Sequence, residues 1–132
     1  ISYRTLLAVF FSSHDQTTLN RQGADIGSQY RSVVFYTTSE QKQEIGRFVS
    51  EINNSNNETH LYSPRQATGY SAKENKGDTI VTEIVPFTKF YEAENYHKNY
   101  FESHTGNPYC EIVIHPKLEK VKKQFGELLK GA

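Results

Sequence analysis

Residues 14–36 read "HDQTTLNRQGADIGSQYRSVVFY", a polar stretch that runs directly into an apolar one. Residues 14–29 show no sustained hydrophobic period, so they predict a loop. Residues 30–38, "YRSVVFYTT", are rich in β-branched and aromatic side chains and predict a strand buried on both faces. A loop that carries many polar groups is therefore followed at once by a core strand.

Helices are predicted on both sides of this stretch. Residues 3–13 place apolar side chains at helical spacing behind Ser2, a candidate N-cap. A second helix is predicted over residues 40–53, with Ser39 as its N-cap. The apolar faces of the two helices consist of Tyr3, Leu6, Leu7, Phe10 and Phe11, and of Ile45, Phe48, Val49 and Ile52. Each stripe is typical of a helix that packs against a core.

The second half of the chain has weaker patterns. Residues 63–78 predict a long surface loop, and residues 79–87 predict a strand that ends or bends at Pro86. Residues 91–104 predict a short helix, and residues 109–114, "YCEIVI", predict a third, short strand. Pro116 is predicted to open a last helix, with Leu118, Val121, Phe125 and Leu128 on its apolar face. Helices that alternate with two or three strands indicate one domain of the α/β (α+β) class over residues 1–132.

The composition excludes several classes of protein. The 15 basic and 15 acidic residues give a formal net charge of zero, so no overall field attracts nucleic acid or an anionic membrane. The single cysteine, Cys110, excludes an intramolecular disulfide, and the histidines show no paired spacing of metal ligands. No apolar run approaches the roughly 18 residues that a membrane span needs. We therefore expect a soluble, cytoplasmic protein without a metal site.

Two stretches of the chain carry a resemblance to a known family. Residues 14–36 closely resemble the signature of the peptide methionine sulfoxide reductase A (MsrA) family, apart from Gln16, where the family usually has proline. Residues 82–101, "TEIVPFTKFYEAENYHKNYF", resemble its second signature, and residues 1–15 resemble the helix before the loop. The resemblance covers almost the whole chain, but only the later part of the family domain. The family's nucleophile lies in a Gly-Cys-Phe-Trp motif, which is absent because the chain has no tryptophan and no cysteine before Cys110.

The resemblance implies both an activity and a fold. The activity is that of a peptide-methionine (S)-S-oxide reductase, which repairs oxidised proteins or peptides by reducing methionine sulfoxide. Thioredoxin or another dithiol would serve as reductant, with no bound cofactor. The fold would be a two-layer α/β sandwich of the ferredoxin-like type, with an incomplete sheet in this chain and low stability alone. The nucleophile would come from an N-terminal segment outside these residues or on another chain.

The resemblance also implies which side chains bind the sulfoxide. By motif match, Asp25 and Tyr30 are the aspartate and tyrosine of the catalytic and substrate-binding set. A tyrosine hydroxyl can donate to the sulfoxide oxygen, and an aspartate can orient the substrate or a water that bonds to it. Two glycines are expected to supply backbone freedom, and two arginines to pair with carboxylates that hold the loop: Gly23, Gly27, Arg21 and Arg31.

Two questions stay open at this point. Cys110 follows a tyrosine, as the resolving cysteine of many family members does, so it is a candidate resolving cysteine. The alternatives are a half-buried strand residue and, more weakly, a nucleophile for other thiol chemistry. The function of the whole chain also has an alternative. The chain would then be a non-catalytic, degenerate MsrA-like module that binds methionine-sulfoxide peptides or is structural only.

Overall fold

The structure, a computed structural model, describes residues 1–54 and 79–129. The contacts between residues divide the chain into a first unit, Ile1–Phe87, and a second unit, Thr88–Ala132. The loop predicted over residues 63–78 lies outside the described residues. The combination of helices with small sheets agrees with the predicted α/β class, whereas a single domain over residues 1–132 stays a prediction.

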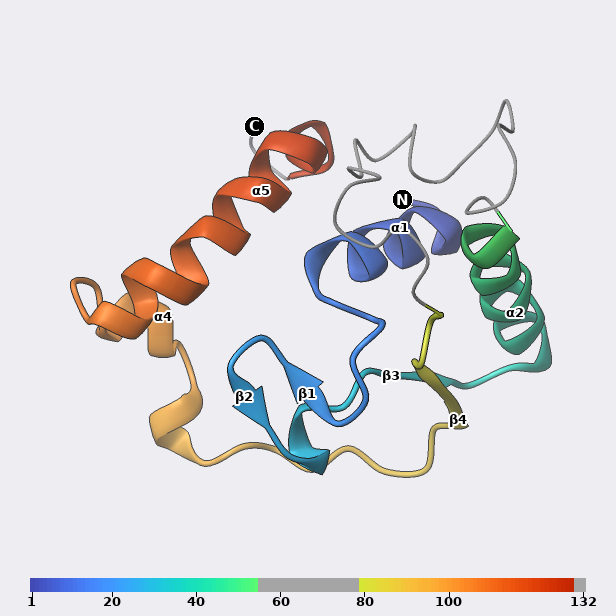
Figure 1. Cartoon of the computed structure of the whole chain (residues 1–132), viewed down its shortest axis with the longest axis horizontal. Coiled ribbons are helices and arrows are strands. Elements are labelled where there is room, and N and C mark those ends of the chain that lie inside the picture. Colours follow the sequence, from blue (N-terminus) through green and yellow to red (C-terminus); the bar gives the residue numbers. More distant parts are fainter. Residues whose placement is uncertain (55–78, 130–132) are drawn as a thin grey trace. The chain divides into compact units, whose positions relative to one another are not determined.

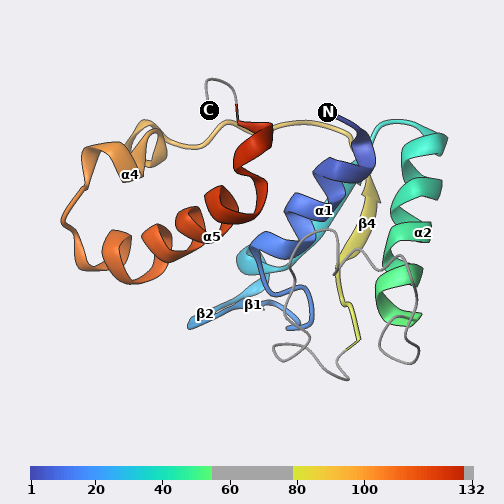
Figure 2. The same ribbon diagram turned by 90° about the horizontal axis from the view of Figure 1, so that it is seen from above.

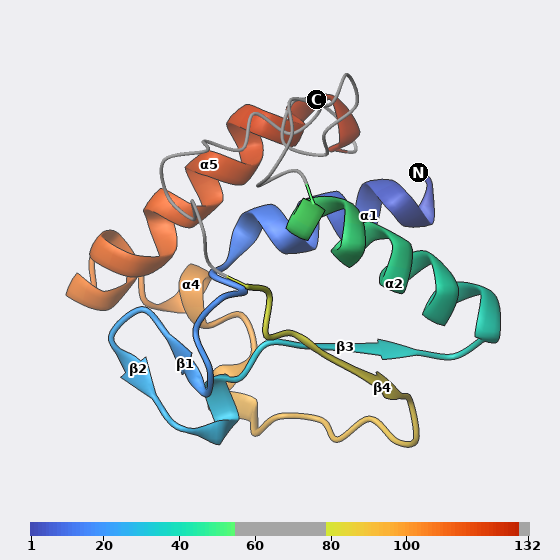
Figure 3. The ribbon, with the colours of Figure 1, turned by 45° about the vertical axis from the view of Figure 1, so that its right-hand side comes forward.

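Two helices and two parallel strands form the packed part of the first unit (Figure 1). Helix α1 spans Tyr3–Ser13 and helix α2 spans Ser39–Asn54, while strand β3 spans Val33–Tyr36 and strand β4 spans Glu83–Pro86. Strands β3 and β4 run side by side in the same direction, with Val33 opposite Glu83 and Tyr36 opposite Pro86 (Figure 3). Since parallel neighbours need a long connection, the crossover through α2 is what allows this pairing.

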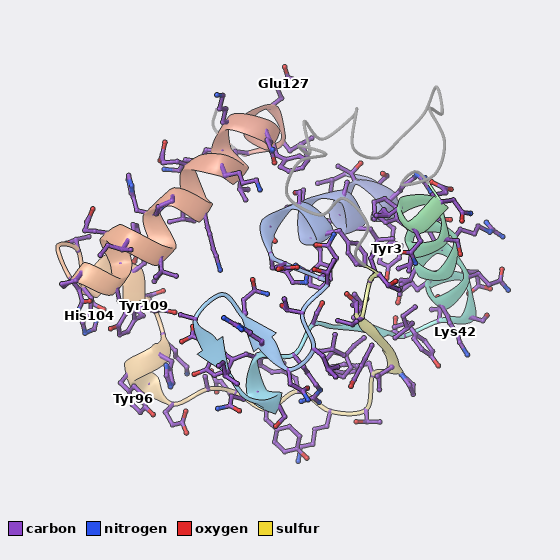
Figure 4. All side chains as sticks on the ribbon, in the orientation of Figure 1. Tyr3, Lys42, Tyr96, His104, Tyr109 and Glu127 are labelled. Carbon is purple, nitrogen blue, oxygen red and sulfur yellow. The ribbon has the colours of Figure 1, made fainter. Side chains whose placement is uncertain are left out.

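The core of the first unit lies between the two helices and one face of this sheet. Figure 2 shows α1 and α2 side by side, and Figure 4 shows Tyr3 on the side of α1 that faces α2. The rings of Phe11 and Phe48 stack between these helices with their centroids 5.5 Å apart. The buried cluster consists of Leu7, Phe11, Ile45, Phe48 and Ile52, with Val34, Tyr36, Ile80 and Ile84 of the sheet side packed against it. Both predicted helical stripes are thus confirmed as core faces, except that Leu6 is 48% exposed and lies outside the cluster.

The caps of the two helices differ in how well the sequence predicts them. The Ser2 hydroxyl accepts a hydrogen bond from the Thr5 N–H at 3.1 Å, which confirms Ser2 as the N-cap of α1. At α2 the prediction of Ser39 is wrong by one residue, because the Thr38 hydroxyl accepts from the Gln41 N–H at 3.2 Å. Both residues have a suitable hydroxyl, so composition alone does not separate them.

Strand β3 is shorter and more exposed than predicted. The strand was expected over residues 30–38 with both faces buried, but Phe35 is 51% exposed. The described helices of this unit cover only the face that carries Val34 and Tyr36. On the other face, Phe35 contacts Phe87 edge to face, with the ring centroids 6.4 Å apart. Pro86 ends β4, as predicted.

The second unit is helical throughout its described regular elements. The predicted helix over residues 91–104 is wrong in extent, because a 3-10 turn at Asn95–His97 and helix α4, Tyr100–Ser103, are separated by left-handed Asn99 (φ 52°). The predicted strand over residues 109–114 is also wrong. Residues Cys110–Ile114 form a π-helical turn that continues into helix α5, His115–Phe125, and Pro116 lies in the first turn of α5, as predicted.

No helix among the described residues is both long and apolar enough to cross a membrane.

Candidate functional site

Asp25 lies in a tight hairpin that follows α1. Strands β1, Arg21–Gln22, and β2, Asp25–Ile26, pair antiparallel with Gln22 opposite Asp25 (Figure 1). The two residues between the strands begin with Gly23 at φ +59°, and a positive φ at this position of a two-residue turn favours glycine. The predicted backbone role of Gly23 is confirmed, and the hairpin presents Asp25 half-buried on its second strand.

Tyr30 ends a single 3-10 turn, Ser28–Tyr30, which we call η1. Gly27 precedes this turn with φ 147° and ψ 158°, a region that is essentially restricted to glycine. Its carbonyl accepts from the Tyr30 N–H at 3.0 Å, and its own N–H donates to the Asn20 carbonyl at 2.9 Å. The Tyr30 residue is 40% exposed, so its side chain is within reach of a ligand.

The two arginines of this region bind different groups. Arg31 donates through Nε to the Glu83 carboxylate of β4 at 3.3 Å and through a terminal nitrogen to the Ser28 carbonyl at 3.0 Å. It thereby pairs with a carboxylate, as predicted, and also closes η1. Arg21 differs from the prediction, because its Nε donates to the backbone carbonyl of Gly23 at 2.7 Å. Both arginines therefore stabilise the backbone around Asp25 and Tyr30.

The beginning of the loop is tied to the hairpin by one side-chain amide. Gln22 accepts from the Asp15 N–H and donates to the Asp15 carbonyl, each at 3.0 Å. The Asp15 carboxylate in turn accepts from the Thr17 N–H at 2.9 Å and from the Thr17 hydroxyl at 2.6 Å. Gln16, at the position where the family usually has proline, is buried, and its carbonyl accepts from the Val81 N–H at 2.9 Å.

One cluster of functional interest was not predicted from the sequence. The imidazole of His14 lies 2.8 Å from the Phe10 carbonyl through Nδ1 and 2.7 Å from the Ser32 hydroxyl through Nε2. The Ser32 hydroxyl also lies 2.7 Å from the Thr82 hydroxyl of the segment that leads into β4. The sequence places both His14 and Ser32 within the matched signature, but no local pattern links Thr82 to them.

The predicted site residues fall into two groups. Asp25 and Tyr30 belong to one continuous segment of the first unit, residues 14–32, which we call the polar loop. Cys110 belongs to the second unit, where it is wholly buried in the π-helical turn. The expectation of a half-buried strand residue is therefore wrong for Cys110, while its resolving role stays a prediction.

The polar loop offers a carboxylate and a phenol hydroxyl from a backbone that is fixed at several points. A phenol can donate one hydrogen bond to an acceptor such as an S=O oxygen, and a carboxylate can hold a water or a ligand N–H. Such groups bind selectively when the backbone that carries them is already ordered, because less conformational entropy is lost on binding. Among residues 1–54 and 79–129, no three His, Cys, Asp or Glu side chains are placed to hold a metal ion.

Comparison with known proteins agrees with the family resemblance of the sequence. The family model described as peptide methionine sulfoxide reductase matches residues 1–129. Proteins named peptide methionine sulfoxide reductase MsrA are 40% identical in Saccharolobus solfataricus (98% of this chain, 62% of that protein), 40% in Deinococcus radiodurans (98% and 54%) and 41% in Acinetobacter baumannii strain AYE (99% and 64%). The chain thus spans 54% to 64% of the length of these curated relatives. The chain belongs to the peptide methionine sulfoxide reductase family.

Proposed function

We propose that this chain is the sulfoxide-binding portion of a peptide-methionine (S)-S-oxide reductase. The observation that carries the proposal is that both matched residues, Asp25 and Tyr30, lie on a polar loop whose backbone is fixed by glycine conformations and side-chain hydrogen bonds. Family membership supports the reaction class. The substrates would be methionine sulfoxide residues in oxidised proteins or peptides.

The proposed reaction removes oxygen from sulfur and oxidises two thiols. A thiolate attacks the sulfoxide, the oxygen is protonated and transferred to the thiol as a sulfenic acid, and methionine leaves. A second thiol then displaces water from the sulfenic acid to form a disulfide, which thioredoxin or another dithiol reduces. The sum is one sulfoxide plus two thiols giving one thioether, one disulfide and one water. No bound cofactor is needed.

In this reaction the residues of the polar loop would act on the sulfoxide oxygen. The Tyr30 hydroxyl would donate to that oxygen as negative charge grows on it, and Asp25 would hold the substrate or a water beside it. A donor that is already aimed at the developing charge lowers the barrier without reorganisation. Arg31 would support this by closing the turn that ends at Tyr30, since it binds the Ser28 carbonyl.

The state of Cys110 favours a second candidate function. A thiol must reach its partner as thiolate, and Cys110, the single cysteine of these residues, is wholly buried. If no other thiol works with this loop, the domain would bind methionine-sulfoxide peptides without reducing them. The thiol that attacks the sulfoxide in the first candidate would come from an N-terminal segment of the same protein or from another chain.

The experiment that tests the proposal measures the reduction of a peptide containing methionine (S)-sulfoxide by the full natural protein, with dithiothreitol as reductant. We expect reduction to the methionine peptide, with kcat/KM about 10²-fold lower for Tyr30→Phe, because one donor to the reacting oxygen is lost. Tyr96→Phe is the matched control, since Tyr96 is 67% exposed in the second unit. Binding without turnover would support the second candidate, and turnover that is unchanged in Tyr30→Phe and Asp25→Asn would refute both site assignments.

A further inference from the structure

The polar loop is closed by one imidazole. His14 is its first residue and Ser32 its last, and the His14 Nε2 lies 2.7 Å from the Ser32 hydroxyl across 18 positions of sequence. Ser32 is only 7% exposed, so this contact lies largely away from solvent. The two ends of the segment that carries Asp25 and Tyr30 are therefore joined directly by side chains.

The donors and acceptors of this cluster form one consistent chain. The Phe10 carbonyl can only accept, so the His14 Nδ1 carries the proton of that contact. In a neutral imidazole Nε2 then accepts, and the Ser32 hydroxyl is its donor. With its proton given to that neutral imidazole, Ser32 in turn accepts from the Thr82 hydroxyl, 2.7 Å away. Every member of the chain has a partner, which is the condition under which a half-buried polar cluster stabilises a structure.

The segment that leads into β4 joins the same two ends through its backbone. The Val81 N–H donates to the Gln16 carbonyl at 2.9 Å, and the Glu83 N–H donates to the Ser32 carbonyl at 3.0 Å. Thr82, between them, reaches the Ser32 hydroxyl. We call His14, Ser32 and Thr82 together the clasp. The clasp and the two backbone hydrogen bonds fix where the polar loop leaves and re-enters the core.

We propose that His14 is a positioning residue that sets the placement of Asp25 and Tyr30 by holding the two ends of the polar loop together. Two short routes connect the clasp to these residues. On one side, Asp15 follows His14 and is bound twice by Gln22, the strand partner of Asp25. On the other side, Ser32 lies two residues after Tyr30. This inference rests on the proposed function, since Asp25 and Tyr30 matter only if they bind the sulfoxide.

Two substitutions of His14 separate its contacts. In His14→Gln the terminal amide replaces Nε2 and can still reach Ser32, whereas in His14→Asn the shorter amide replaces Nδ1 and keeps only the contact with the Phe10 carbonyl. His104 offers a matched control, because its Nδ1 also lies close to the carbonyl four residues earlier, 2.9 Å from that of Tyr100. Its ring stacks on the ring of that same residue at 4.1 Å, and His104 belongs to the second unit.

The experiment titrates the full natural protein and each variant, first oxidised to the disulfide so that no thiol can reduce the probe, with N-acetyl-methionine-sulfoxide methylamide, and follows binding by NMR without reductant. We expect His14→Asn to raise Kd about three- to tenfold, the equivalent of one net hydrogen bond. His14→Gln should stay close to the parent, and His104→Asn should equal it. Arg4→Met, which destabilises the same unit away from the loop, should leave Kd unchanged. In His14→Asn alone, the N–H groups of Gly27 and Tyr30 should exchange faster with solvent.

Each other outcome has a definite meaning. A parent-like Kd in His14→Asn, an equal loss in His14→Gln, or an equal loss in Arg4→Met would overturn the positioning role. If the parent does not bind the probe, or if Asp25→Asn and Tyr30→Phe bind it as the parent does, the proposed function fails instead. The exchange of the Gly27 and Tyr30 N–H groups then still decides whether the clasp orders the loop, because that measurement needs no ligand.

Discussion

Replacing Gly27 by alanine is expected to destabilise the polar loop through its backbone. Gly27 has φ 147° and ψ 158°, and holding an L-residue in that region costs about 1–3 kcal/mol. An added Cβ would also lie 2.3 Å from the Gln29 Oε1. Because Gln29 is an exposed, flexible side chain, it can rotate away at little cost. We therefore expect Gly27→Ala to lose about 1–3 kcal/mol of unfolding free energy, and Gln29→Ala to restore almost none of it.

Two other glycines provide controls, because replacing one of them by alanine should destabilise the protein and replacing the other should stabilise it. Gly23 has φ +59° with no atom within 4 Å of an added Cβ, so Gly23→Ala should cost about 1–2 kcal/mol from the left-handed backbone alone. Gly46 lies inside α2, also with no atom within 4 Å, so Gly46→Ala should stabilise the protein by about 0.5–1 kcal/mol. The series thus separates backbone conformation from side-chain crowding.

The assay for this series is equilibrium unfolding in urea followed by far-ultraviolet circular dichroism. Binding of the methionine-sulfoxide probe is measured on the same samples, and Gly27→Ala should weaken it, because the Gly27 carbonyl binds the Tyr30 N–H. A Gly27→Ala protein as stable as the parent would refute the argument. So would full rescue by Gln29→Ala, since crowding rather than backbone strain would then be the cause.

Three further predictions concern the helices and the cysteine. Burial alone would lower the pKa of Arg4, but its hydrogen bonds to Glu44 and Glu51 raise the pKa overall, and its guanidinium lies over the Phe48 ring. Arg4→Met should therefore cost about 1–2 kcal/mol in urea unfolding, and no change would contradict this. The pKa of Glu40 is lowered by hydrogen bonds from its own N–H and then from nearby hydroxyls. Glu40→Gln should therefore lower the melting temperature at pH 7, and the difference should shrink as the pH falls below the ordinary pKa of 4.5 and through the lowered pKa of the folded protein; a difference that does not change with pH would refute this. Cys110 should react with a disulfide reagent about a hundredfold more slowly in the native protein than in urea, and equal rates would contradict its burial.

Local patterns of the sequence predict much of the first unit. The helical stripes around Phe11 and Phe48 and the hydroxyl cap at Ser2 involve residues within a few positions of one another, and the structure confirms them. Pro86 and Pro116 likewise act through their own backbone, which lacks an N–H and fixes φ. A single sequence shows such short-range effects directly.

Part of what the sequence does not predict depends on distant parts of the chain. Residues 109–114 have strand composition, but a strand needs a neighbour to pair with, and this segment forms its hydrogen bonds locally within a helical turn. Ile112 is 74% exposed there, so its apolar character does not mark a buried strand. The contact of Ser32 with Thr82 spans 50 positions, and no periodicity or motif in a single sequence predicts such a contact.

The position of the polar loop directly before a core strand has a physical reason. The His14 ring lies 4.4 Å from the Phe10 ring and 6.4 Å from the Phe11 ring, between centroids, and Phe11 stacks on Phe48 of α2. The core therefore fixes the imidazole, the imidazole holds Ser32, and Ser32 begins the run into β3. A loop with no hydrophobic period cannot order itself by burial, because it has little apolar surface to remove from water. Anchoring both of its ends to one packed cluster lets polar residues such as Asp25 and Tyr30 keep a defined place without being fully buried.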